Sequence, residues 1–598
     1  MKHIIQKGQN KMLKNCKKII INYGFKIDNK NHIFDSDGNE ICNFAPVVLG
    51  QYIIGVGRDR RTIVTLMGID EDGKQLETVD IEVNEIDNLK WVKNSWGFQY
   101  KVHSKMKSQF MYLIEVLVIN GVTKRLSSHI GWVKDNGKYV YLHTRGVIGK
   151  SDQEVDIGDH LNNYFLPNEI VDIKKACKAS LKLLEVADYE VTIPLLALVY
   201  LSPLLQAIKD VGKMPEFVVW LFGTTGSRKT SLARVFLSHF GDFTNRLPAT
   251  FNDTCSSIEI KAHAIKDSLN LIDDYAPKQT KNQKYAQDEV AERTIRAYGD
   301  RIARGRANSS MIGQKQLTPQ GMLLITGENL IRGHSTVARL VALELDRGSV
   351  NLKLLKEMQD NINLLSESMR GYIEWLLPEM NKENSSIGGI LIHNFDTYKE
   401  ELEEMEFTQT KGGHGRSIEA CAWLMVGIAS MLTYFEDRGV ISEDEFDQHI
   451  QFAKNTIANI LMKNNSITKE SSPIDEFLYT LKEAMDSKSI KINTLVDGNK
   501  VNENDDNTYG YKDDKYYYLH PDKTFNYMQD VQSKSGNYIS LTKKGLFKLL
   551  KENSIIKVDS DGSVSKYTLK VKDDTKESGY REDRPRLLRI AISTIEQL

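Results

Sequence analysis

One segment constrains the fold of this chain more than any other: residues 217–236, which read FVVWLFGTTGSRKTSLARVF. An apolar run rich in β-forming residues is followed by a glycine-containing turn and then by a stretch with the apolar spacing of a helix. In that order the turn points successive backbone N–H groups into one concavity, and the start of the helix adds a partial positive charge. The segment therefore predicts a phosphate-binding loop.

Within this loop, Lys229 is expected to reach the β- and γ-phosphates of a nucleotide, and Thr230 to place its hydroxyl on Mg²⁺. The strict loop pattern has glycine immediately before the lysine, whereas this chain has Arg228. Arginine fits there if its φ is negative, because only a left-handed conformation demands glycine. A glycine turn that binds no ligand is the alternative. The predicted nucleotide-binding residues are Gly223, Thr224, Thr225, Gly226, Ser227, Arg228, Lys229, Thr230 and Ser231.

A second apolar run, SLNLIDDYA at 268–276, ends in two adjacent acids, Asp273 and Asp274. In phosphate-loop NTPases the first acid holds Mg²⁺ and the second orients or deprotonates the attacking water. Asp273 is thus predicted as the second Mg²⁺ partner beside Thr230. Asp274 is the candidate base, although the usual residue is Glu, which is longer by one methylene, so this assignment stays open. Two acids that only cap a strand are the alternative.

A third apolar run, GMLLITGEN at 321–329, ends in polar residues, of which Thr326 and Asn329 are both candidates for contact with a γ-phosphate or with the attacking water. The three strands in this order resemble the ATPases of the AAA+ superfamily, in which such a strand-end residue is called sensor 1. The resemblance implies that one of these two residues senses the nucleotide.

The same resemblance implies roles for arginines further along the chain. Arg339, or with less support Arg332, falls where the superfamily places a finger that reaches into a neighbouring subunit and stabilises charge on the transferred phosphoryl group. Arg416, at the start of an apolar helix, resembles the lid arginine called sensor 2. The alternative for each arginine is a surface position or an ordinary ion pair.

A local excess of positive charge lies between the second and third apolar runs, although the whole chain has a net charge of −1. Backbone phosphates need only a positive group on a mobile support, so this composition suits DNA contact without sequence preference. A hairpin just before the third strand resembles the pre-sensor hairpin of ring helicases. A solvated basic helix, or a subunit interface for Arg304 and Arg306, is the alternative. The excess comprises Arg293, Arg296, Arg301, Arg304, Arg306 and Lys315 against Glu292 and Asp300, and the predicted DNA contacts are Lys315, Arg304 and Arg306.

Composition restricts the class of protein. The chain has 598 residues, enough for several folding units, and 41% hydrophobic and 27% charged residues, as globular proteins do. Its five cysteines form no C-x-x-C pair, which argues against a zinc ribbon and favours a reducing, cytoplasmic compartment. Residues 191–208 carry no charge and reach the lower length limit of a bilayer span. Because Pro194 and Pro203 interrupt them, we expect a buried helix and no membrane partner.

Changes of pattern along the chain predict four units. Asx-Gly pairs between short apolar runs, at Asp37-Gly38, Asp72-Gly73, Asn120-Gly121 and Asn136-Gly137, predict hairpins. Near the C-terminus, residues 537–556 predict a helix and 557–571 a hairpin, while the polar stretch 496–515 predicts a loop. The expected units are a β-rich N-terminal domain with a basic arm (1–150), an α/β core with leading helices (151–345), a helical lid (346–470) and a winged-helix-like domain (471–598).

Taken together, GTTGSRKTSLA, LNLIDDYAP and LLITGEN, with SSHIGWVKDNGKYVYLHTRGVIG upstream, resemble the MCM-like AAA+ replicative helicases of staphylococcal cassette chromosome elements, the Cch group. The resemblance covers roughly residues 20–465. Over residues 217–345, strand-like apolar runs alternate with helical stretches, which predicts the α/β class with a parallel sheet. The resemblance adds an AAA+ phosphate-loop core and a hexameric ring that hydrolyses ATP with Mg²⁺. It also implies a DNA helicase with a single strand in its central channel, acting in replication of a mobile genetic element.

Two other functions fit the same motifs. The ATPase could remodel proteins or serve a defence system, because a fold alone does not name the polymer that is moved. Alternatively, Arg228 and Asp274 could reduce turnover, which would leave a nucleotide-switched DNA-binding initiator. The ATPase rate with and without single-stranded DNA, followed by strand displacement, separates the three functions.

Overall fold

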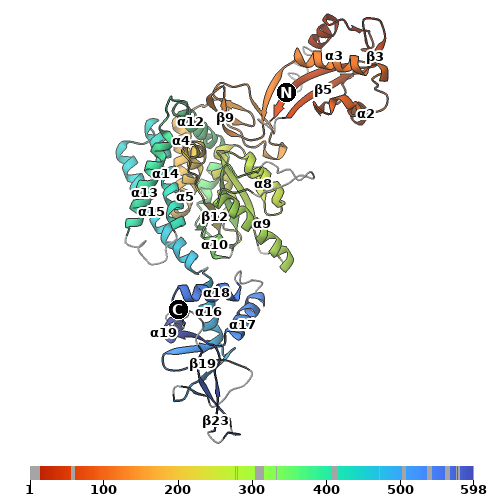
Figure 1. Ribbon diagram of the computed structural model, residues 1–598. Coiled ribbons are helices and arrows are strands. Elements are labelled where there is room, and N and C mark those ends of the chain that lie inside the picture. Colours follow the sequence, from red (N-terminus) through yellow and green to blue (C-terminus); the bar gives the residue numbers. More distant parts are fainter. Residues whose placement is uncertain are drawn as a thin grey trace.

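The computed structural model contains three units in chain order, with the N-terminal and C-terminal units at opposite ends of a larger central unit (Figure 1). Each unit has its own hydrophobic core: Cys16 to Leu117, Ile130 to Leu461, and Phe477 to Ile595. The structure describes residues 14–54, 61–276, 278, 280–303, 316–331, 333–405, 415–470, 472–497, 499–501, 507–534, 542–558, 566–573, 575–576 and 579–596.

A parallel five-stranded sheet organises the central unit and confirms the predicted α/β class. Its strand order is β13-β14-β15-β12-β16, and every neighbouring pair is parallel. The carboxyl ends of all five strands therefore meet at one edge of the sheet, where ligands of open α/β sheets bind. The strands are β12 (Val218–Phe222), β13 (Ala249–Thr250), β14 (Leu269–Tyr275), β15 (Met322–Gly327) and β16 (Leu340–Glu344).

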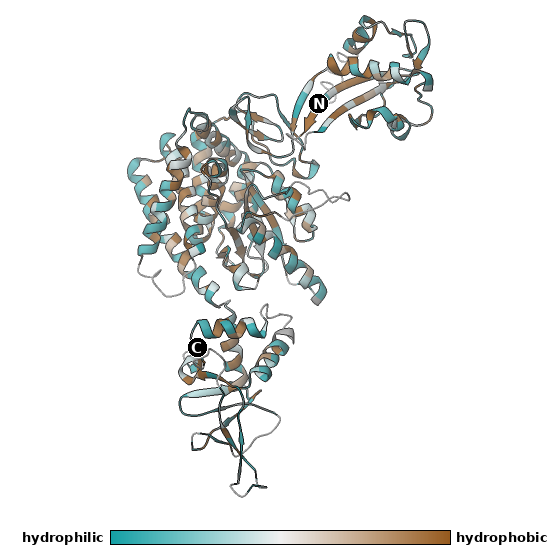
Figure 2. Cartoon of the chain, in the orientation of Figure 1, coloured by the Kyte–Doolittle hydropathy of each residue, from teal (hydrophilic) through white to brown (hydrophobic). Residues whose placement is uncertain are grey.

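Both faces of this sheet are covered, which explains why its strands are apolar runs without polar alternation. Val219 and Leu221 of β12 enter one core with α7 (Lys229–Leu237), whereas Val218 and Trp220 enter a second core with α8 (Cys255–Ala264) and α9 (Lys281–Gly299). Figure 2 shows hydrophobic residues concentrated in the interior of the central unit. The sheet is therefore a rigid middle layer.

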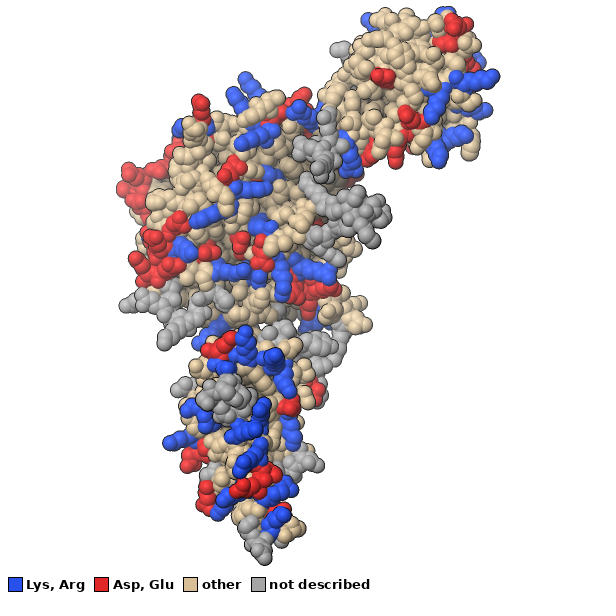
Figure 3. Space-filling view, in the orientation of Figure 1, with Lys and Arg blue, Asp and Glu red and all other residues tan. Residues whose placement is uncertain are grey.

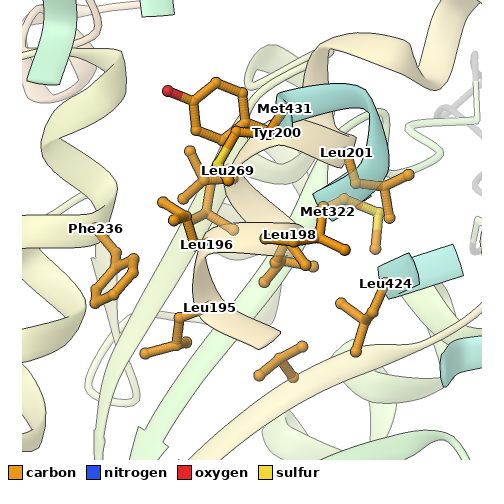
Figure 4. Close-up of a cluster of buried hydrophobic side chains, with 14 of the residues drawn as sticks. Leu195, Leu196, Leu198, Tyr200, Leu201, Phe236, Leu269, Met322, Leu424 and Met431 are labelled. Atoms are coloured by element: carbon orange, nitrogen blue, oxygen red, sulfur yellow. The ribbon is translucent and has the colours of Figure 1, made fainter. Parts of the chain in front are cut away.

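Helix α5 (Tyr189–Leu201) lies at the centre of the helical layer on the α7 side, packed against α14 (Gly415–Asp437). Figure 4 shows Leu195, Leu198 and Tyr200 of α5 among side chains of α7, α14 and the sheet. The segments 189–210 and 415–437 are long and apolar enough to cross a membrane, but 94% and 83% of their most apolar windows are buried inside the protein. The prediction of a buried helix at 191–208 is confirmed.

The predicted helices of 346–470 are present, but they share one core with the leading helices 173–210. A β-carbon on Gly427 of α14 would lie 2.3 Å from the carbonyl oxygen of Ala197, so glycine permits the close approach of α14 to α5. The remaining helices of this layer are α4 (Ile173–Lys182), α6 (Leu205–Asp210), α11 (Leu352–Asp360), α12 (Ile362–Met380), α13 (Ile387–Glu404) and α15 (Glu443–Glu470).

A small antiparallel sheet of β8 (Gly131–Asp135), β9 (Lys138–His143) and β10 (Gly146–Ile148) packs on the central unit, although it precedes residue 150. Trp132 and Tyr141 are buried in the central core. Asp267 fixes the attachment, because its carboxylate accepts the Trp132 backbone N–H at 2.9 Å and pairs with the buried Lys266 ammonium group. The boundary between the core of the N-terminal unit and that of the central unit therefore lies before β8 and not at residue 150.

The N-terminal unit combines strands with helices, including one over residues 14–22. Asp37-Gly38, Asp72-Gly73 and Asn136-Gly137 form the predicted hairpin turns, but Asn120-Gly121 ends a helix, so that hairpin prediction is wrong. The elements are β1 (Lys26–Ile27), β2 (Ile33–Phe34), β3 (Glu40–Cys42), β4 (Ala45–Ile54), β5 (Arg61–Ile69), β6 (Val79–Glu82), α2 (Lys90–Trp96), α3 (Lys107–Ile119) and β7 (Thr123–Ser127), with β11 (Glu154–Val155) pairing on β7.

In the C-terminal unit the predicted helix is α18 (Lys543–Glu552). The hairpin predicted at 557–571 is not formed by the described residues of that segment, which lie on either side of residues 559–565. Strand β21 (Ile556–Lys557) pairs with β24 (Leu588–Ala591), whereas β22 (Leu569–Lys572) pairs with β23 (Tyr580–Asp583) in another sheet. The predicted loop at 496–515 contains β18 (Lys500–Val501) and β19 (Thr508–Lys512). The other elements are α16 (Pro473–Asp486), β17 (Lys491–Thr494), β20 (Tyr516–Leu519), α17 (Pro521–Lys534) and α19 (Ile592–Glu596).

Replacing Asp267 by Ala should destabilise the central unit by about 3–5 kcal/mol, because it leaves the buried Lys266 ammonium group unpaired. The measurement is the midpoint of urea unfolding of the full chain, monitored by circular dichroism. A double change, Lys266→Met with Asp267→Asn, removes both charges and keeps an acceptor for the Trp132 N–H, so it should recover most of the loss. Equal midpoints for wild type and Asp267→Ala would contradict the assigned attachment.

Candidate nucleotide site

The loop between β12 and α7 has the shape that the sequence pattern predicts for phosphate binding. It leaves the sheet at Gly223, whose φ is +154°, and a β-carbon there would lie 2.3 Å from the Leu345 carbonyl oxygen. Glycine is therefore required at this position. Helix α7 begins at Lys229, so its amino end, with its unpaired N–H groups, faces the loop.

The Lys229 side chain lies along this loop. Its Nζ donates to the backbone carbonyls of Gly223 at 2.6 Å and Thr224 at 3.0 Å. Burial lowers the pKa of Lys229, and the opposing charges that favour the ammonium form come from Glu328, Asp273 and Asp274, in that order. The lysine thus sits at the meeting point of the loop and three carboxylates.

Two threonine hydroxyls, from α7 and β15, converge on one carboxylate oxygen of β14. Thr230 Oγ1 of α7 donates to Asp273 Oδ1 of β14 at 2.9 Å, and Thr326 Oγ1 of β15 donates to the same oxygen. Thr326 Oγ1 in turn accepts the backbone N–H of Asp274 at 3.2 Å. The structure therefore brings together the predicted Mg²⁺ pair and one of the two sensor candidates.

This oxygen-rich corner fits a magnesium ion. Mg²⁺ prefers hard oxygen ligands and is commonly held by one or two carboxylates with substrate phosphates and water. Thr230 and Asp273 supply a hydroxyl and a carboxylate side by side. Among the described residues no group of three or more His, Cys, Asp or Glu could hold a metal, so substrate oxygens would complete the coordination here.

Two residues of the site have left-handed backbone conformations. Arg228 has φ +73° and ψ 19°, which corrects the expectation that arginine would be accommodated there by a negative φ. Asp274 has φ +70° and lies in an irregularity of the β14–β15 register between Ile272 and Tyr275. Each such position costs a non-glycine residue on the order of 1–2 kcal/mol, somewhat less for aspartate. The loop and the strand end are therefore both strained.

These groups surround a cavity of about 260 Å³. Residues 225, 226 and 228–231 line it from the loop and α7, while Asp274 and residues 326–328 line it from the strand ends. Asn329, the other sensor candidate, is exposed and does not line it. Sequence reasoning missed Glu328, which lies between the two sensor candidates and does line the cavity. The signal was present, since Glu328 is an acid at the end of a predicted strand.

The two arginines assigned by resemblance lie at the opposite edge of the sheet. The Arg339 carbonyl accepts the N–H of Val218, at the amino end of β12, so the length of β12, about 16 Å, separates it from the loop. Arg339 makes a two-pronged contact with Asp300, with N–O distances of 2.9 and 3.0 Å, and Arg416 reaches the same carboxylate at 3.2 Å. Neither arginine contacts its own chain's loop.

Asp300 joins these arginines into one cluster. Burial alone raises the pKa of Asp300, but the hydrogen bonds and charges of Arg339 and Arg416 outweigh it and hold that pKa below its ordinary value. The Arg416 side chain is 43% exposed, whereas that of Arg339 is 13% exposed. The Arg416 guanidinium of this cluster is therefore exposed to solvent, at a place remote from the loop.

The predicted DNA-contacting residues Lys315, Arg304 and Arg306, like Arg332, lie outside the described residues. Of the other members of the basic excess, Arg301 is structural, because its guanidinium donates to the carbonyls of Pro215 and Gly321. Two more pair with acids one turn away on α9, Arg293 with Glu289 and Arg296 with Glu292. In the described part of this segment, carbonyl groups or neighbouring acids therefore engage arginines that composition alone counts as excess positive charge.

Comparison with solved structures adds one strong similarity. A structure described as "SCCmec type IV Cch - active helicase" superposes on 96% of this chain and 99% of that chain, with a TM-score of 0.61 at 12% sequence identity. The fold is shared along nearly the whole chain. This confirms the resemblance to the Cch group at the level of the fold.

The remaining comparisons contribute little. A JCV helicase structure aligns over 44% of this chain and 66% of that chain at 15% identity, and its TM-score of 0.22 carries no argument. No protein-family model matches the sequence, and no curated protein matches it.

Changing Arg228 to Gly should maintain or raise the thermal midpoint, because glycine adopts a φ of +73° without a steric penalty. Changing the same residue to Val should lower the midpoint below wild type, since a β-branched residue is poorly tolerated there. Differential scanning fluorimetry of the three proteins measures the order. Equal midpoints for the Gly and Val variants would contradict the left-handed conformation.

Proposed function

We propose that this protein is an ATP-dependent DNA helicase, a ring-forming AAA+ motor of the MCM-like type that acts in replication of a mobile genetic element. The observation that carries the proposal is the convergence of Thr230, Asp273 and Thr326 beside Lys229, at the edge where the sheet's strands end. The similarity of fold to an active helicase of the Cch group supports it.

The chemistry begins with the triphosphate of the substrate. The backbone N–H groups of the loop and the amino end of α7 would bind phosphate oxygens, and the Lys229 ammonium would exchange its carbonyl partners for the β- and γ-phosphates. Thr230 and Asp273 would hold Mg²⁺, which neutralises charge on the phosphates when bound. Thr326 would keep the Asp273 carboxylate oriented.

The binding of DNA is supported by charge on the C-terminal unit. Figure 3 shows Lys and Arg side chains spread over the visible face of this unit among smaller groups of acids. Helix α18 buries Leu546 and Leu550 and exposes lysines on its other side, as a phosphate-contacting helix would. The exposed lysines are Lys543, Lys544, Lys548 and Lys551, of which Lys543 pairs with Asp522 and Lys548 with Glu552.

The assembly into a ring is supported by the position of the arginine cluster. Arg339 and Arg416 lie at the amino edge of the sheet, remote from their own loop. Arg416 is exposed there, whereas Arg339 would have to release Asp300 to reach a neighbouring copy of the chain. In the proposed ring they stabilise charge on the phosphoryl group held by that neighbour.

The test of the proposed function is ATP hydrolysis and strand displacement by the purified chain. We expect hydrolysis to be stimulated by single-stranded DNA and a forked duplex to be unwound. Lys229→Ala should abolish both by removing the charge that binds the phosphates. Hydrolysis without displacement would favour a protein remodeller, and ATP binding without turnover would favour a switched initiator.

A mixing experiment tests the roles of the arginines in trans. Arg339→Ala should assemble but hydrolyse ATP at least about 10³-fold more slowly, the effect of losing an arginine finger. Mixed with Lys229→Ala, it should regain activity, because some interfaces then pair an intact loop with an intact arginine. The control mixes Lys229→Ala with Asp273→Asn, whose defects lie in the same half of the site. No recovery in the first mixture would contradict action in trans.

A further inference from the structure

The acid predicted to act as the base is poorly placed for that role. Asp274 is the second acid of β14, but its backbone turns to φ +70° at the irregularity of the strand, and its side chain is exposed. Its backbone N–H is used to hold Thr326. An aspartate is also one methylene shorter than the glutamate usual at this position, so it projects less far into the cavity.

Glu328 offers a second carboxylate on the same cavity, from the neighbouring strand. Its backbone N–H donates to the Tyr275 carbonyl at 2.9 Å, which fixes the chain just beyond the end of β15 to β14. Its side chain is half-buried and accepts a hydrogen bond from the Thr225 hydroxyl across the cavity mouth. Both the backbone and the side chain of Glu328 are therefore held by hydrogen bonds to elements that form the site.

The Glu328 carboxylate and the phosphate-binding Lys229 belong to the same cavity. Thr225, which donates to that carboxylate, lies on the same loop as the lysine. Asp273 is committed to two threonine hydroxyls. Glu328 thus combines the reach of a glutamate with a position on the wall of the cavity that would hold the γ-phosphate.

We propose that Glu328, in place of Asp274, orients and deprotonates the water that attacks the γ-phosphate. The inference rests on the proposed ATP hydrolysis. The water oxygen bonds to the γ-phosphorus, the bond from that phosphorus to the β–γ bridging oxygen breaks, and one water proton passes to the Glu328 carboxylate. ADP and inorganic phosphate are the products. The Thr225 hydroxyl donates to the Glu328 carboxylate at the cavity. When nucleotide and water bind, the phosphate would compete for the hydroxyl and the water for the carboxylate.

The variant Glu328→Gln separates this role from that of a structural brace. Glutamine has the same shape and still accepts the Thr225 hydrogen bond, so a residue that only braces the loop would tolerate the change. A base would not, because the amide cannot take a proton. The loss of one negative charge also means that nucleotide should bind as tightly as before, or more tightly.

Glu344 provides a matched control. It is another glutamate at the carboxyl end of a strand, β16, which borders β12 on the side away from β15, and it is exposed. It does not line the cavity. Glu344→Gln should therefore hydrolyse ATP at the wild-type rate.

The experiment measures kcat for ATP in the full chain and the dissociation constant of a fluorescent ATP analogue. Glu328→Gln should lower kcat about 100-fold or more, the usual effect of losing a general base, with nucleotide affinity unchanged or increased. Asp274→Asn should lose less. The proposal is overturned if Glu328→Gln keeps kcat within about threefold of wild type, or if Asp274→Asn has the larger effect. If wild type and Glu344→Gln are also inactive, the proposed function itself fails.

Discussion

The hydrogen bond from Thr230 to Asp273 is the contact on which the site depends. It joins the first turn of α7 to the end of β14, and Thr326 adds β15 to the same carboxylate oxygen. Because the strands are parallel and buried on both faces, their ends are held by the whole central unit and not by local loops. The geometry of the oxygen cluster therefore reflects the packing of α5, α7 and the sheet.

Around this hydrogen bond the chain contains backbone strain and neighbouring like charges, which a sheet edge with only a structural role would not need. Arg228 and Asp274 both have left-handed backbones, one on each side of the cavity. Glu328, Asp273 and Asp274 gather beside a single lysine. Such concentrations of strain and like charge are typical of functional sites, because packing elsewhere stabilises them. At the far edge, Asp300 pairs with both Arg339 and Arg416.

The sequence predicts well which residues form the site and which elements carry them. The strand, the loop, the helix and the strand-end acids are local patterns, and the parallel sheet brings them together. The sequence predicts less well what tertiary contacts decide. The left-handed φ of Arg228 is a property of the folded loop that its local pattern does not specify. The Asn120-Gly121 pair ends a helix because the residues before it bury the apolar face of α3. The strand pairing of 557–571 is set by distant partners. The strand-end position of Glu328 is visible in the sequence, but its contact with Thr225, remote in sequence, is not.

The central claim is that a nucleotide and its divalent ion bind between Lys229 and Asp273. Electron paramagnetic resonance of Mn²⁺, used in place of Mg²⁺ with a slowly hydrolysed ATP analogue, tests it most directly. The account predicts that wild type immobilises Mn²⁺ only when the analogue is present, and that Asp273→Asn loses most of this binding while remaining folded. Mn²⁺ bound equally well by both proteins, or without the analogue, would contradict the account.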